Sequence, residues 1–215
     1  MSEDPSRTRE SYDALAATYT ERLFTELGGK PLDRHLLNRL AEDVRGRGLV
    51  ADLGCGPGHV ARYLHEHGVR MLGIDLSPGM IDQARTLSPD IEFRVGDMRG
   101  LELPDGALAG IVAFYSLIHI GEPEMGATLR ELRRVLTPGG LLLVAFHIGE
   151  ETVHRDELWG HAVSLDFRFL MPDRMAAHLA EAGFRLMERV EREPYPEIEH
   201  PSRRCYLLAR SPADQ

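Results

Sequence analysis

The sequence has only two cysteines, Cys55 and Cys205, and only one lysine, Lys30, among its 25 basic residues. Two cysteines do not make a disulfide framework, which suits a reducing compartment. A single lysine nearly excludes lysine as a catalytic base and leaves histidine and tyrosine as the side chains to consider. Long apolar runs are also missing. The longest, at 141–146, is far shorter than the roughly 20 residues that a membrane-spanning helix needs.

Positive charge is scarce overall, because 34 acidic residues outweigh the basic ones and give a formal net charge of −9. An acidic chain is a poor partner for nucleic acid or anionic membranes, so we expect neither. The first ten residues, MSEDPSRTRE, have no apolar core, so we expect no signal peptide and a cytoplasmic protein. At 215 residues the chain has the length of one domain, or of one domain with an appendage.

The hydrophobic pattern divides the chain near residue 46. Two stripes with helical spacing precede this point, so we expect an N-terminal helical cap over 1–46. Over 47–215, short apolar runs alternate with helical stripes, and this alternation is typical of parallel strands joined by helices. We therefore predict an α/β fold with helices on both faces of a roughly seven-stranded, mostly parallel sheet that has one antiparallel strand. The expected strands lie at 49–53, 71–74, 91–95, 108–116, 141–146, 184–190 and 205–209.

The segment 148–170 fits neither the helical nor the strand period well, and we expect it to be an insertion over the carboxyl edge of the sheet. It contains the only tryptophan, Trp159, together with His161 and other aromatic residues. An aromatic insertion at that edge suits a lid over a substrate, with Trp159 and His161 as candidate substrate contacts. It could equally pack against a second subunit, so the oligomeric state stays open and a homodimer is one alternative.

A glycine-rich turn follows the first expected strand, in the sequence Asp52-Leu53-Gly54-Cys55-Gly56-Pro57-Gly58. Glycines at such a turn let a ligand approach the backbone closely. A dinucleotide fingerprint would need glycine or alanine at position 59, where His59 stands. Asp52 would also repel a pyrophosphate and favour a cationic ligand. Both observations disfavour a nicotinamide-dependent oxidoreductase, which remains an alternative.

Two further acids follow the next two expected strands. Asp75 stands 21 residues after Gly54, which is about where an acid binds ribose hydroxyls in doubly wound nucleotide sites. Asp97 lies in Gly96-Asp97-Met98, beside the adenine end of such a site. Three acids at neighbouring strand tips suit an adenosine that carries a positive group. Taken singly, Asp75 could be a strand-end cap and Asp97 a turn residue.

These motifs resemble the class I S-adenosylmethionine-dependent methyltransferases, which have a Rossmann-like fold. The resemblance rests on DLGCGPG at 52–58, GIDLSP at 73–78, GDM at 96–98 and LTPGG at 136–140. It implies that Gly54 and Gly56 contact the methionine part of the cofactor, with Asp52 near its amino group. It also implies that Asp75 holds the ribose, and that Asp97 and Met98 bind the adenine. The complete set of expected cofactor-binding residues is Tyr19, Asp52, Gly54, Cys55, Gly56, Asp75, Leu76, Asp97, Met98 and Tyr115.

The segment from Tyr12 to Tyr19 resembles the N-terminal helix of small-molecule methyltransferases, whose aromatic residues cover the cofactor. Tyr12 is therefore a candidate substrate contact and Tyr19 a candidate cofactor contact. Both tyrosines also lie on an apolar helical stripe, where core packing alone would explain them.

The candidate catalytic residues lie at the tip of the fourth expected strand, in the sequence Phe114-Tyr115-Ser116-Leu117-Ile118-His119. His119 is the candidate base, because a neutral imidazole titrates near working pH, although it could instead contact the substrate or simply pack. His147 ends the fifth strand and could reach the same crevice as a substrate contact. The histidines lack metal-ligand spacing, so we expect no metal.

The function that these residues predict is methyl transfer from S-adenosylmethionine to an oxygen or nitrogen nucleophile of a small-molecule acceptor. The tip of the fourth strand lacks the N/D-P-P-Y/F signature of enzymes that methylate amino groups of nucleic acid bases. The main alternative is a non-catalytic module that binds the same cofactor in order to sense it or to act as a scaffold. Tyr115 and His119 favour catalysis, because a degraded strand tip of small residues would be expected in a binding module.

Overall fold

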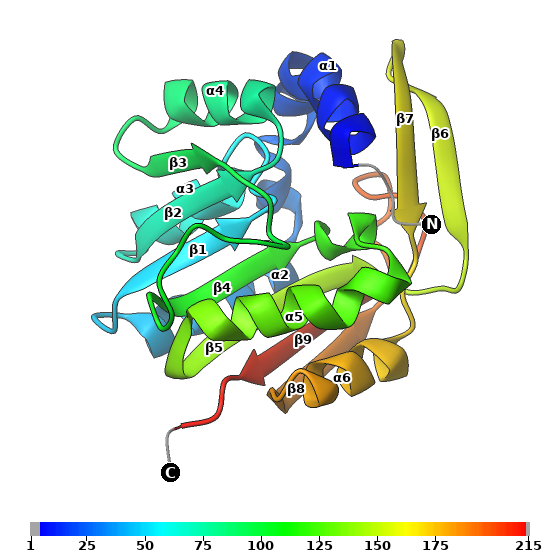
Figure 1. Cartoon of the computed structure of the whole chain (residues 1–215). Coiled ribbons are helices and arrows are strands. Elements are labelled where there is room, and N and C mark those ends of the chain that lie inside the picture. Colours follow the sequence, from blue (N-terminus) through cyan, green and yellow to red (C-terminus); the bar gives the residue numbers. More distant parts are fainter. Residues whose placement is uncertain (1–4, 214–215) are drawn as a thin grey trace.

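The computed structural model describes residues 5–213, and a seven-stranded sheet forms its centre (Figure 1). The strand order is β3-β2-β1-β4-β5-β9-β8. Strand β9 runs antiparallel to both of its neighbours, and the other pairs are parallel. This confirms the predicted α/β sheet. The strands are β1 (Leu49–Leu53), β2 (Arg70–Asp75), β3 (Glu92–Val95), β4 (Leu108–Phe114), β5 (Leu136–His147), β8 (Arg185–Arg192) and β9 (Arg204–Arg210).

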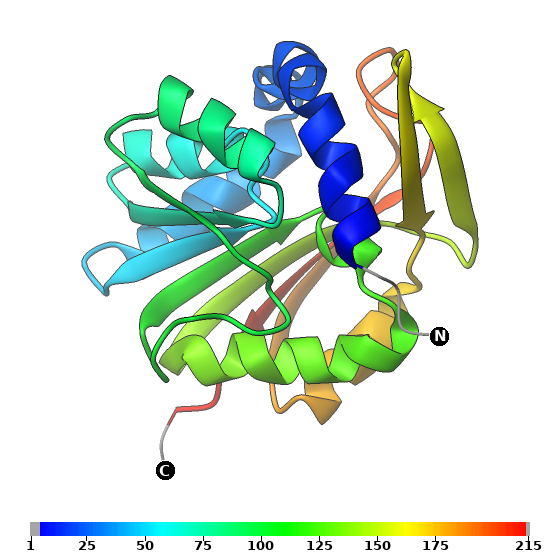
Figure 2. The same cartoon turned by 45° about the horizontal axis from the view of Figure 1, so that its top comes forward.

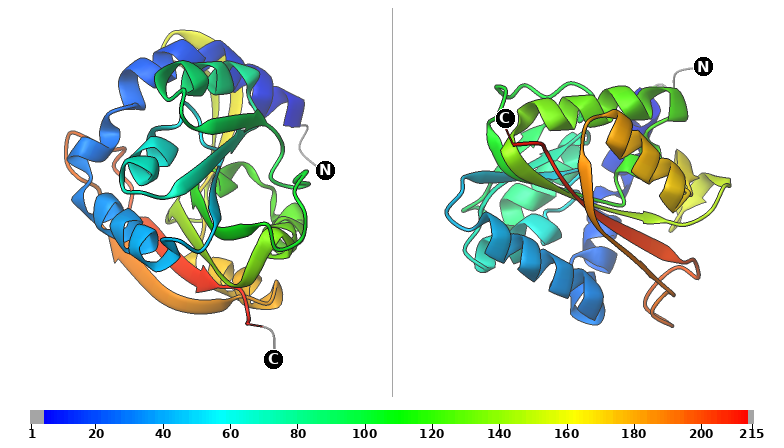
Figure 3. Two further views of the ribbon diagram at one scale, coloured as in Figure 1. Left: turned by 90° about the vertical axis from the view of Figure 1, so that its left-hand side faces the viewer. Right: turned by 90° about the horizontal axis from the view of Figure 1, so that it is seen from below.

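Helices cover both faces of the sheet, and each face has its own apolar core (Figure 3). Leu129 and Leu179 are buried on the face that α5 and α6 cover. Leu37 and Leu64 are buried on the opposite face, under α2, α3 and α4. The helices are α1 (Pro5–Leu23), α2 (Pro31–Val44), α3 (His59–Glu66), α4 (Pro78–Leu87), α5 (Glu122–Val135) and α6 (Pro172–Glu181), with short 3-10 turns η1 (Glu26–Gly29) and η2 (Leu117–His119).

Helix α1 stands beside the sheet, between α4 and the strand β7 (Figure 2). The predicted cap over 1–46 thus corresponds to α1, η1 and α2, and its first four residues lie outside the described part of the chain. Its role as a cover for a cofactor stays a prediction. The position of α1 matters because its tyrosines approach the carboxyl ends of the central strands.

The insertion expected at 148–170 contains a two-stranded hairpin, β6 (Thr152–Leu158) and β7 (His161–Arg168), separate from the main sheet. Leu158 pairs with His161, so Trp159 and Gly160 alone form the turn. Their φ angles are 52° and 85°, as a type I′ hairpin turn requires. Tryptophan rarely adopts a positive φ, so the backbone at Trp159 is strained.

One strand boundary differs from the expectation. Strand β5 begins at Leu136, directly after α5, and it includes the Pro138-Gly139-Gly140 segment that we expected to separate helix from strand. Leu136 pairs with Leu108 and Leu141 pairs with Gly110, so the residues between Leu136 and Leu141, the two glycines included, form an irregularity within β5. Within residues 5–213, none of the helices has the length and apolarity that crossing a bilayer demands.

Candidate functional site

A cavity of about 110 Å³ lies where the central parallel strands end, which is the usual ligand position in this class of sheet. Most of the residues expected to bind the cofactor line it, together with two residues, Tyr12 and His119, that were expected to contact or convert the substrate. These lining residues are Tyr12, Tyr19, Gly54, Gly56, Asp75, Leu76, Asp97, Met98, Tyr115 and His119. We call this space the strand-tip cavity. Asp52 and Cys55 lie instead on a smaller space of about 40 Å³ that shares Gly54 and Gly56 with it.

The glycine turn after β1 has a backbone that larger residues would not tolerate. Gly54, Gly56 and Gly58 have φ angles of 69°, 52° and 82°. A Cβ atom on Gly54 would lie 2.3 Å from the Cβ of Ser116, and one on Gly58 would lie 2.7 Å from the ring of Phe93. The turn is therefore restricted to glycine by both conformation and space, and it leaves the backbone bare beside the cavity.

Asp75 at the end of β2 holds this turn in place. Its carboxylate accepts hydrogen bonds from the backbone N–H of Gly56, at 2.8 Å, and of Ser77, at 2.9 Å. Each oxygen accepts one bond, so lone pairs remain for hydroxyl donors such as those of a ribose. Burial raises the pKa of Asp75, because desolvation outweighs the two N–H donors. The residues present thus fit the adenosine part of the expected cofactor.

Asp97 after β3 is half-buried and already bound by Arg99. The guanidinium donates to both carboxylate oxygens, with Nε 3.0 Å from each, and the backbone N–H of Arg99 donates as well. Although burial alone would raise the pKa of Asp97, these hydrogen bonds lower it. Asp97 is therefore an ionised acceptor at the tip of β3, as an amino group of adenine requires. Arg99 is a neighbour that the motif itself did not indicate.

Asp52 is deeply buried near the glycine turn, with 2% of its surface exposed. Its Oδ2 accepts from the backbone N–H of Ala61 at 3.0 Å. Burial raises the pKa of Asp52 to about 7, although the attraction of His59 partly opposes this rise. A cationic ligand group at the small cavity would favour the ionised form. This fits the amino group of the expected cofactor. The thiol of Cys55 beside it has a pKa raised by burial, so it is not a nucleophile at neutral pH.

A second and larger cavity, of about 400 Å³, lies on the other side of three tyrosines. We call it the hairpin cavity, because residues of β6, β7 and their turn, including Trp159 and Phe167, form part of its wall. Tyr12, Tyr19 and Tyr115 line both this cavity and the strand-tip cavity. Burial raises the pKa of each of the three phenols, so they stay neutral and can donate a hydrogen bond. They form the boundary across which two bound molecules would meet.

The contacts of His119 differ from those of a free base. Its Nδ1 lies 3.0 Å from the carbonyl oxygen of Asp166, so Nδ1 carries the proton and donates it there. Its Nε2 then accepts from the hydroxyl of Tyr12 at 2.7 Å. Burial lowers the pKa of His119 to about 4, so the ring is neutral. Both nitrogens are occupied, and His119 lines the strand-tip cavity rather than the hairpin cavity. The geometry favours positioning of Tyr12 over direct proton removal.

The remaining substrate candidates fall in two places. His147 and Trp159 line the hairpin cavity, and the ring of Trp159 lies 5.9 Å from that of Tyr19. His161 is not among the lining residues of either cavity, and its Nε2 lies 2.9 Å from the hydroxyl of Thr18. The structure therefore gives His161 a different place from the one expected. This contact joins the hairpin to α1, and the role of His161 as a substrate contact stays a prediction.

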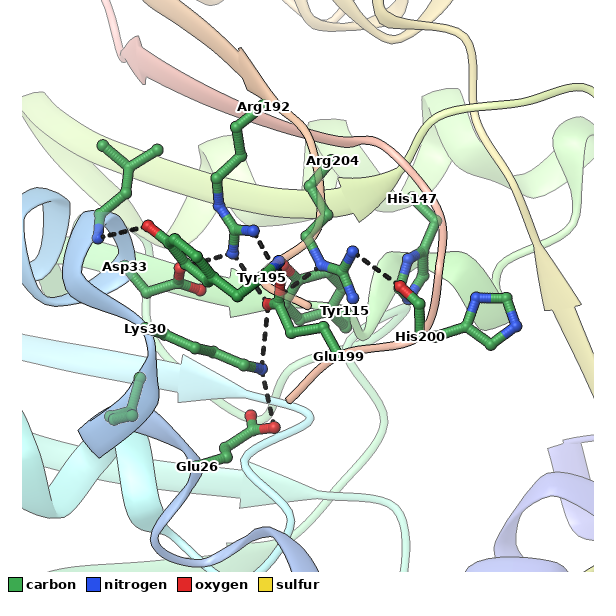
Figure 4. A network of polar contacts seen from close by, with 12 residues as sticks. Glu26, Lys30, Asp33, Tyr115, His147, Arg192, Tyr195, Glu199, His200 and Arg204 are labelled. Atoms are coloured by element: carbon green, nitrogen blue, oxygen red, sulfur yellow. Dashed lines mark hydrogen bonds and ion pairs between the residues drawn. The ribbon is translucent and has the colours of Figure 1, made fainter. Parts of the chain in front are cut away.

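Sequence reasoning missed a cluster of charged residues at the wall of the hairpin cavity (Figure 4). Lys30 Nζ lies 2.7 Å from Glu26 and 3.6 Å from Glu199, and 5.5 Å from the ring centre of Tyr115. Arg204 Nε lies 3.1 Å from Glu199. The one lysine, which the composition had set aside as a base, is thus 5% exposed and faces the cavity. Its rarity was the only signal in the sequence.

Comparison with known proteins finds similarity in the region that contains these motifs. Residues 50–140 match the family model described as a methyltransferase domain. The malonyl-(acyl-carrier protein) O-methyltransferase of Serratia marcescens is 36% identical over 138 residues, which are 64% of this chain and 49% of that protein. The trans-aconitate 2-methyltransferase of Escherichia coli is 41% identical over 97 residues, 44% of this chain and 37% of that protein. The chain thus spans about half the length, or less, of these curated relatives.

The solved structure of the DhpI–SAH complex has the same fold. It aligns with a TM-score of 0.74 at 22% identity and covers 98% of this chain and 97% of that one. The alignment extends well beyond the matched family region, so it includes the elements that form both cavities.

Proposed function

We propose that the chain is a class I S-adenosylmethionine-dependent methyltransferase that transfers the methyl group of this cofactor to an oxygen or nitrogen atom of a small molecule. The match of residues 50–140 to a methyltransferase domain and the two methyltransferase relatives support this proposal. The observation that carries the proposal is the meeting of two cavities at Tyr12, Tyr19 and Tyr115. One cavity has the glycine turn and the strand-tip acids that suit the cofactor. The other has an aromatic wall and room for an acceptor.

Each part of the strand-tip cavity has a proposed task. Asp75 binds the ribose hydroxyls, and Asp97 with the backbone of Met98 binds the adenine. Gly54 and Gly56 allow close approach of the methionine part, and Asp52 attracts its amino group. When bound, the cofactor supplies a methyl group on a sulfonium, which already contains the leaving group. The protein therefore mainly has to align the acceptor with that carbon and exclude water.

The three tyrosines and the hairpin would perform this alignment. Tyr12 is oriented by His119, and its ring packs edge-on against Tyr19 at 6.0 Å. Tyr115 has a positive φ of 53°, and its hydroxyl lies 3.2 Å from that of Tyr206, which fixes the ring between the cavities. Non-glycine residues in such strained conformations are concentrated at functional sites. We propose that the hairpin with Trp159 acts as the lid expected from the sequence.

The two relatives are named for methyl transfer to different acceptors, O-methyl transfer to malonyl-(acyl-carrier protein) in one case and methyl transfer to trans-aconitate in the other. The second name supports a small-molecule acceptor. The 400 Å³ hairpin cavity favours catalysis over a module that only binds the cofactor, because such a module needs no second cavity. The buried acid Asp52 beside the glycine turn continues to disfavour a nicotinamide cofactor.

Calorimetric titration with S-adenosylhomocysteine and, separately, with NAD tests the cofactor. We expect binding of the first at micromolar concentrations and none of the second, and the opposite pattern would reject the proposal. Incubation with methyl-labelled S-adenosylmethionine and a panel of small alcohols, phenols, amines and acids then tests transfer. Binding of the cofactor without a labelled product from the panel or from cell extracts would favour the non-catalytic module.

A further inference from the structure

Four of the five charged residues that line the hairpin cavity come from outside the hairpin, and the two carboxylates among them are already bound by the protein. Lys30, Arg155 and Arg204 line it together with Glu26 and Glu199, an excess of one positive charge. Arg192 binds both oxygens of Glu199 at 2.6 and 2.8 Å, and the backbone N–H of Tyr195 donates to it at 2.8 Å. Although burial alone would raise the pKa of Glu199, the hydrogen bonds from Arg192 lower it. This glutamate therefore stays ionised and has little capacity left for a ligand.

Glu26 is used in the same way. It lies 2.7 Å from Lys30 and 3.3 Å from His59. Burial alone would raise its pKa, but these two partners lower it to about 2. Neither carboxylate at the cavity wall is thus a base of useful strength at neutral pH, and neither is free to bind a cationic acceptor.

Arg204 has donor capacity that the protein does not use. The residue is 3% exposed, and its Nη1 donates to the carbonyl oxygens of His200 and Ser202. Nε lies close to Glu199 but makes no hydrogen bond of good geometry. Among residues 5–213, none accepts a hydrogen bond from Nη2. A buried guanidinium with unused donors is costly unless a ligand supplies the acceptor, and Arg204 lines the cavity.

His147 lies near the positively charged residues of the cavity wall, and burial together with these charges lowers its pKa. His147 lies in the cavity wall, with its ring 5.0 Å from that of Tyr115 and its Nδ1 2.8 Å from the hydroxyl of Ser202. Its pKa falls to about 3, first because it is buried and then because Arg204, His200 and Lys30 repel a further positive charge. His147 is therefore neutral and a weak base. An anion at this position would be stabilised by the same charges.

Apart from Arg155, the hairpin contributes an apolar and aromatic wall. Trp159, Phe167 and Phe169 come from the hairpin and the residue after it, and they line the same cavity as Tyr115. Such walls favour a flat or unsaturated body of low polarity. The volume of about 400 Å³ suits a ligand of modest size. The cavity is thus matched to a molecule with an apolar body and one negative end.

We propose that the acceptor is a carboxylic acid with an aromatic or otherwise apolar body, whose carboxylate accepts hydrogen bonds from Arg204 and lies beside Lys30. This inference rests on the proposed methyl transfer and specifies its substrate class. A carboxylate suits the site better than a more highly charged group, because the cavity wall has an excess of only one positive charge. The planar fork of arginine matches the two oxygens of a carboxylate.

The test compares acids with neutral molecules of the same shape. Benzoate, phenylacetate and 3-phenylpropionate are titrated into the protein saturated with S-adenosylhomocysteine, alongside the corresponding amides. We expect the best acid of the series to bind at least tenfold more tightly than its amide, as one charge-assisted hydrogen bond implies. Equal affinities of acid and amide, or no detectable affinity for any acid, would overturn the proposal.

Two neighbouring arginines provide a matched pair of variants. Arg204→Gln should abolish the preference for acid over amide, whereas Arg203→Gln should keep it. The side chain of Arg203 is 53% exposed and pairs with Glu191 and Glu193 outside the cavity. If Arg204→Gln does not fold, Arg204→Lys keeps the charge but loses the fork, and we expect it to reduce the preference severalfold. An unchanged preference in every folded Arg204 variant would contradict the assignment.

A parallel titration separates this inference from the proposed function. Affinity for S-adenosylhomocysteine should be the same in the wild type and in the Arg204 variants. If the Arg204 variants lose that affinity, the guanidinium binds the carboxylate of the cofactor, and the acceptor assignment is wrong. If the wild type methylates neutral acceptors and ignores acids, only the substrate class fails. If the wild type does not bind the cofactor at all, the proposed function itself fails.

Discussion

The hydroxyl of Tyr12 lies 2.7 Å from Nε2 of His119, and this contact ties helix α1 to the turn after strand β4. Because Nδ1 of the same ring donates to the carbonyl of Asp166 in strand β7, the imidazole joins three segments that are far apart in the sequence. The tyrosine that separates the two cavities is thus held by a histidine whose proton position is fixed. The contact therefore suggests that His119 affects catalysis by positioning Tyr12 rather than by exchanging a proton with the substrate.

Replacement of His119 tests whether it acts through Tyr12. We expect His119→Ala to lower kcat about tenfold, because the variant loses the hydrogen bond that holds the hydroxyl of Tyr12 between the two cavities. The affinity for S-adenosylhomocysteine should change little. Tyr12→Phe should have a similar effect, and the double variant should be no worse than either single one. His119→Gln can keep both hydrogen bonds and should restore most of the rate. Additive effects in stopped-flow or steady-state assays would show that the two residues act separately.

The pH dependence of the rate checks the same assignment. The pKa of His119 is about 4, so the ring stays neutral from pH 6 to 8. A rate that rises through pH 6.5 in the wild type and becomes flat in His119→Ala would assign the proton transfer to His119 after all.

Replacement of Asp75 tests the ribose role. We expect Asp75→Asn to weaken binding of S-adenosylhomocysteine at least tenfold, because it removes a charged acceptor and also loosens the N–H of Gly56 that the carboxylate now holds. Asp82→Asn is the control, since its side chain lies on α4 and is 77% exposed. Calorimetry measures both. Retained affinity in Asp75→Asn would remove this residue from the cofactor site.

Replacement of Asp52 should separate stability from binding. The folded-state pKa of about 7 exceeds the ordinary value of 3.8, so between these values the folded protein holds a proton that the unfolded chain has released. This contribution to stability is therefore present at low pH and is lost as the pH rises through 7. At about 1.4 kcal/mol per pKa unit, we expect Asp52→Asn to raise the unfolding free energy at pH 8 by on the order of 2 kcal/mol.

The same variant should bind the cofactor more weakly, because the acid that attracts the amino group is gone. Chemical denaturation at pH 6 and pH 8 measures the first effect, with Asp90→Asn as an exposed control. A stability gain that is equal at both pH values would contradict the proposed titration of Asp52.

Trp159 gives the hairpin cavity its own optical probe, because it is the only tryptophan of the chain. We expect its emission to change when 3-phenylpropionate binds, and Trp159→Ala to raise the Kd of that acid about tenfold through loss of an aromatic wall. Cofactor affinity should be unaffected, and Trp159→Phe should retain most of the binding. Emission that responds to S-adenosylhomocysteine but not to the acid would show that the tryptophan faces the cofactor only.

The sheet and the strand-tip cavity could be predicted because each of their signals is local. Gly54, Gly56 and Asp75 follow apolar strands directly, and the parallel sheet brings those strand ends together. The hairpin was missed because β6 is largely exposed, β7 is mostly half-buried, and neither has a clear alternation of buried and exposed residues. Its turn also contains Trp159-Gly160 in place of the usual Asn-Gly or Asp-Gly pair.

The charged wall of the hairpin cavity could not be predicted for a different reason. Lys30 precedes α2, whereas Glu199 and Arg204 lie about 170 residues later, in and after the loop between β8 and β9. No periodicity connects such positions, and only the closure of the sheet by β9 brings them together. His161 is a different case, because it belongs to the expected aromatic segment but its ring contacts the hydroxyl of Thr18 in α1.

The burial of Lys30 has a practical consequence for chemistry in solution. As the sole lysine, it offers the only side-chain amine in the chain, and it is 5% exposed and paired with Glu26. Amine-directed acylating reagents therefore have a single side-chain target, and it faces the hairpin cavity rather than the outer surface. The rate at which Lys30 is acylated then measures how accessible the cavity is, and a ligand bound in the cavity should lower that rate.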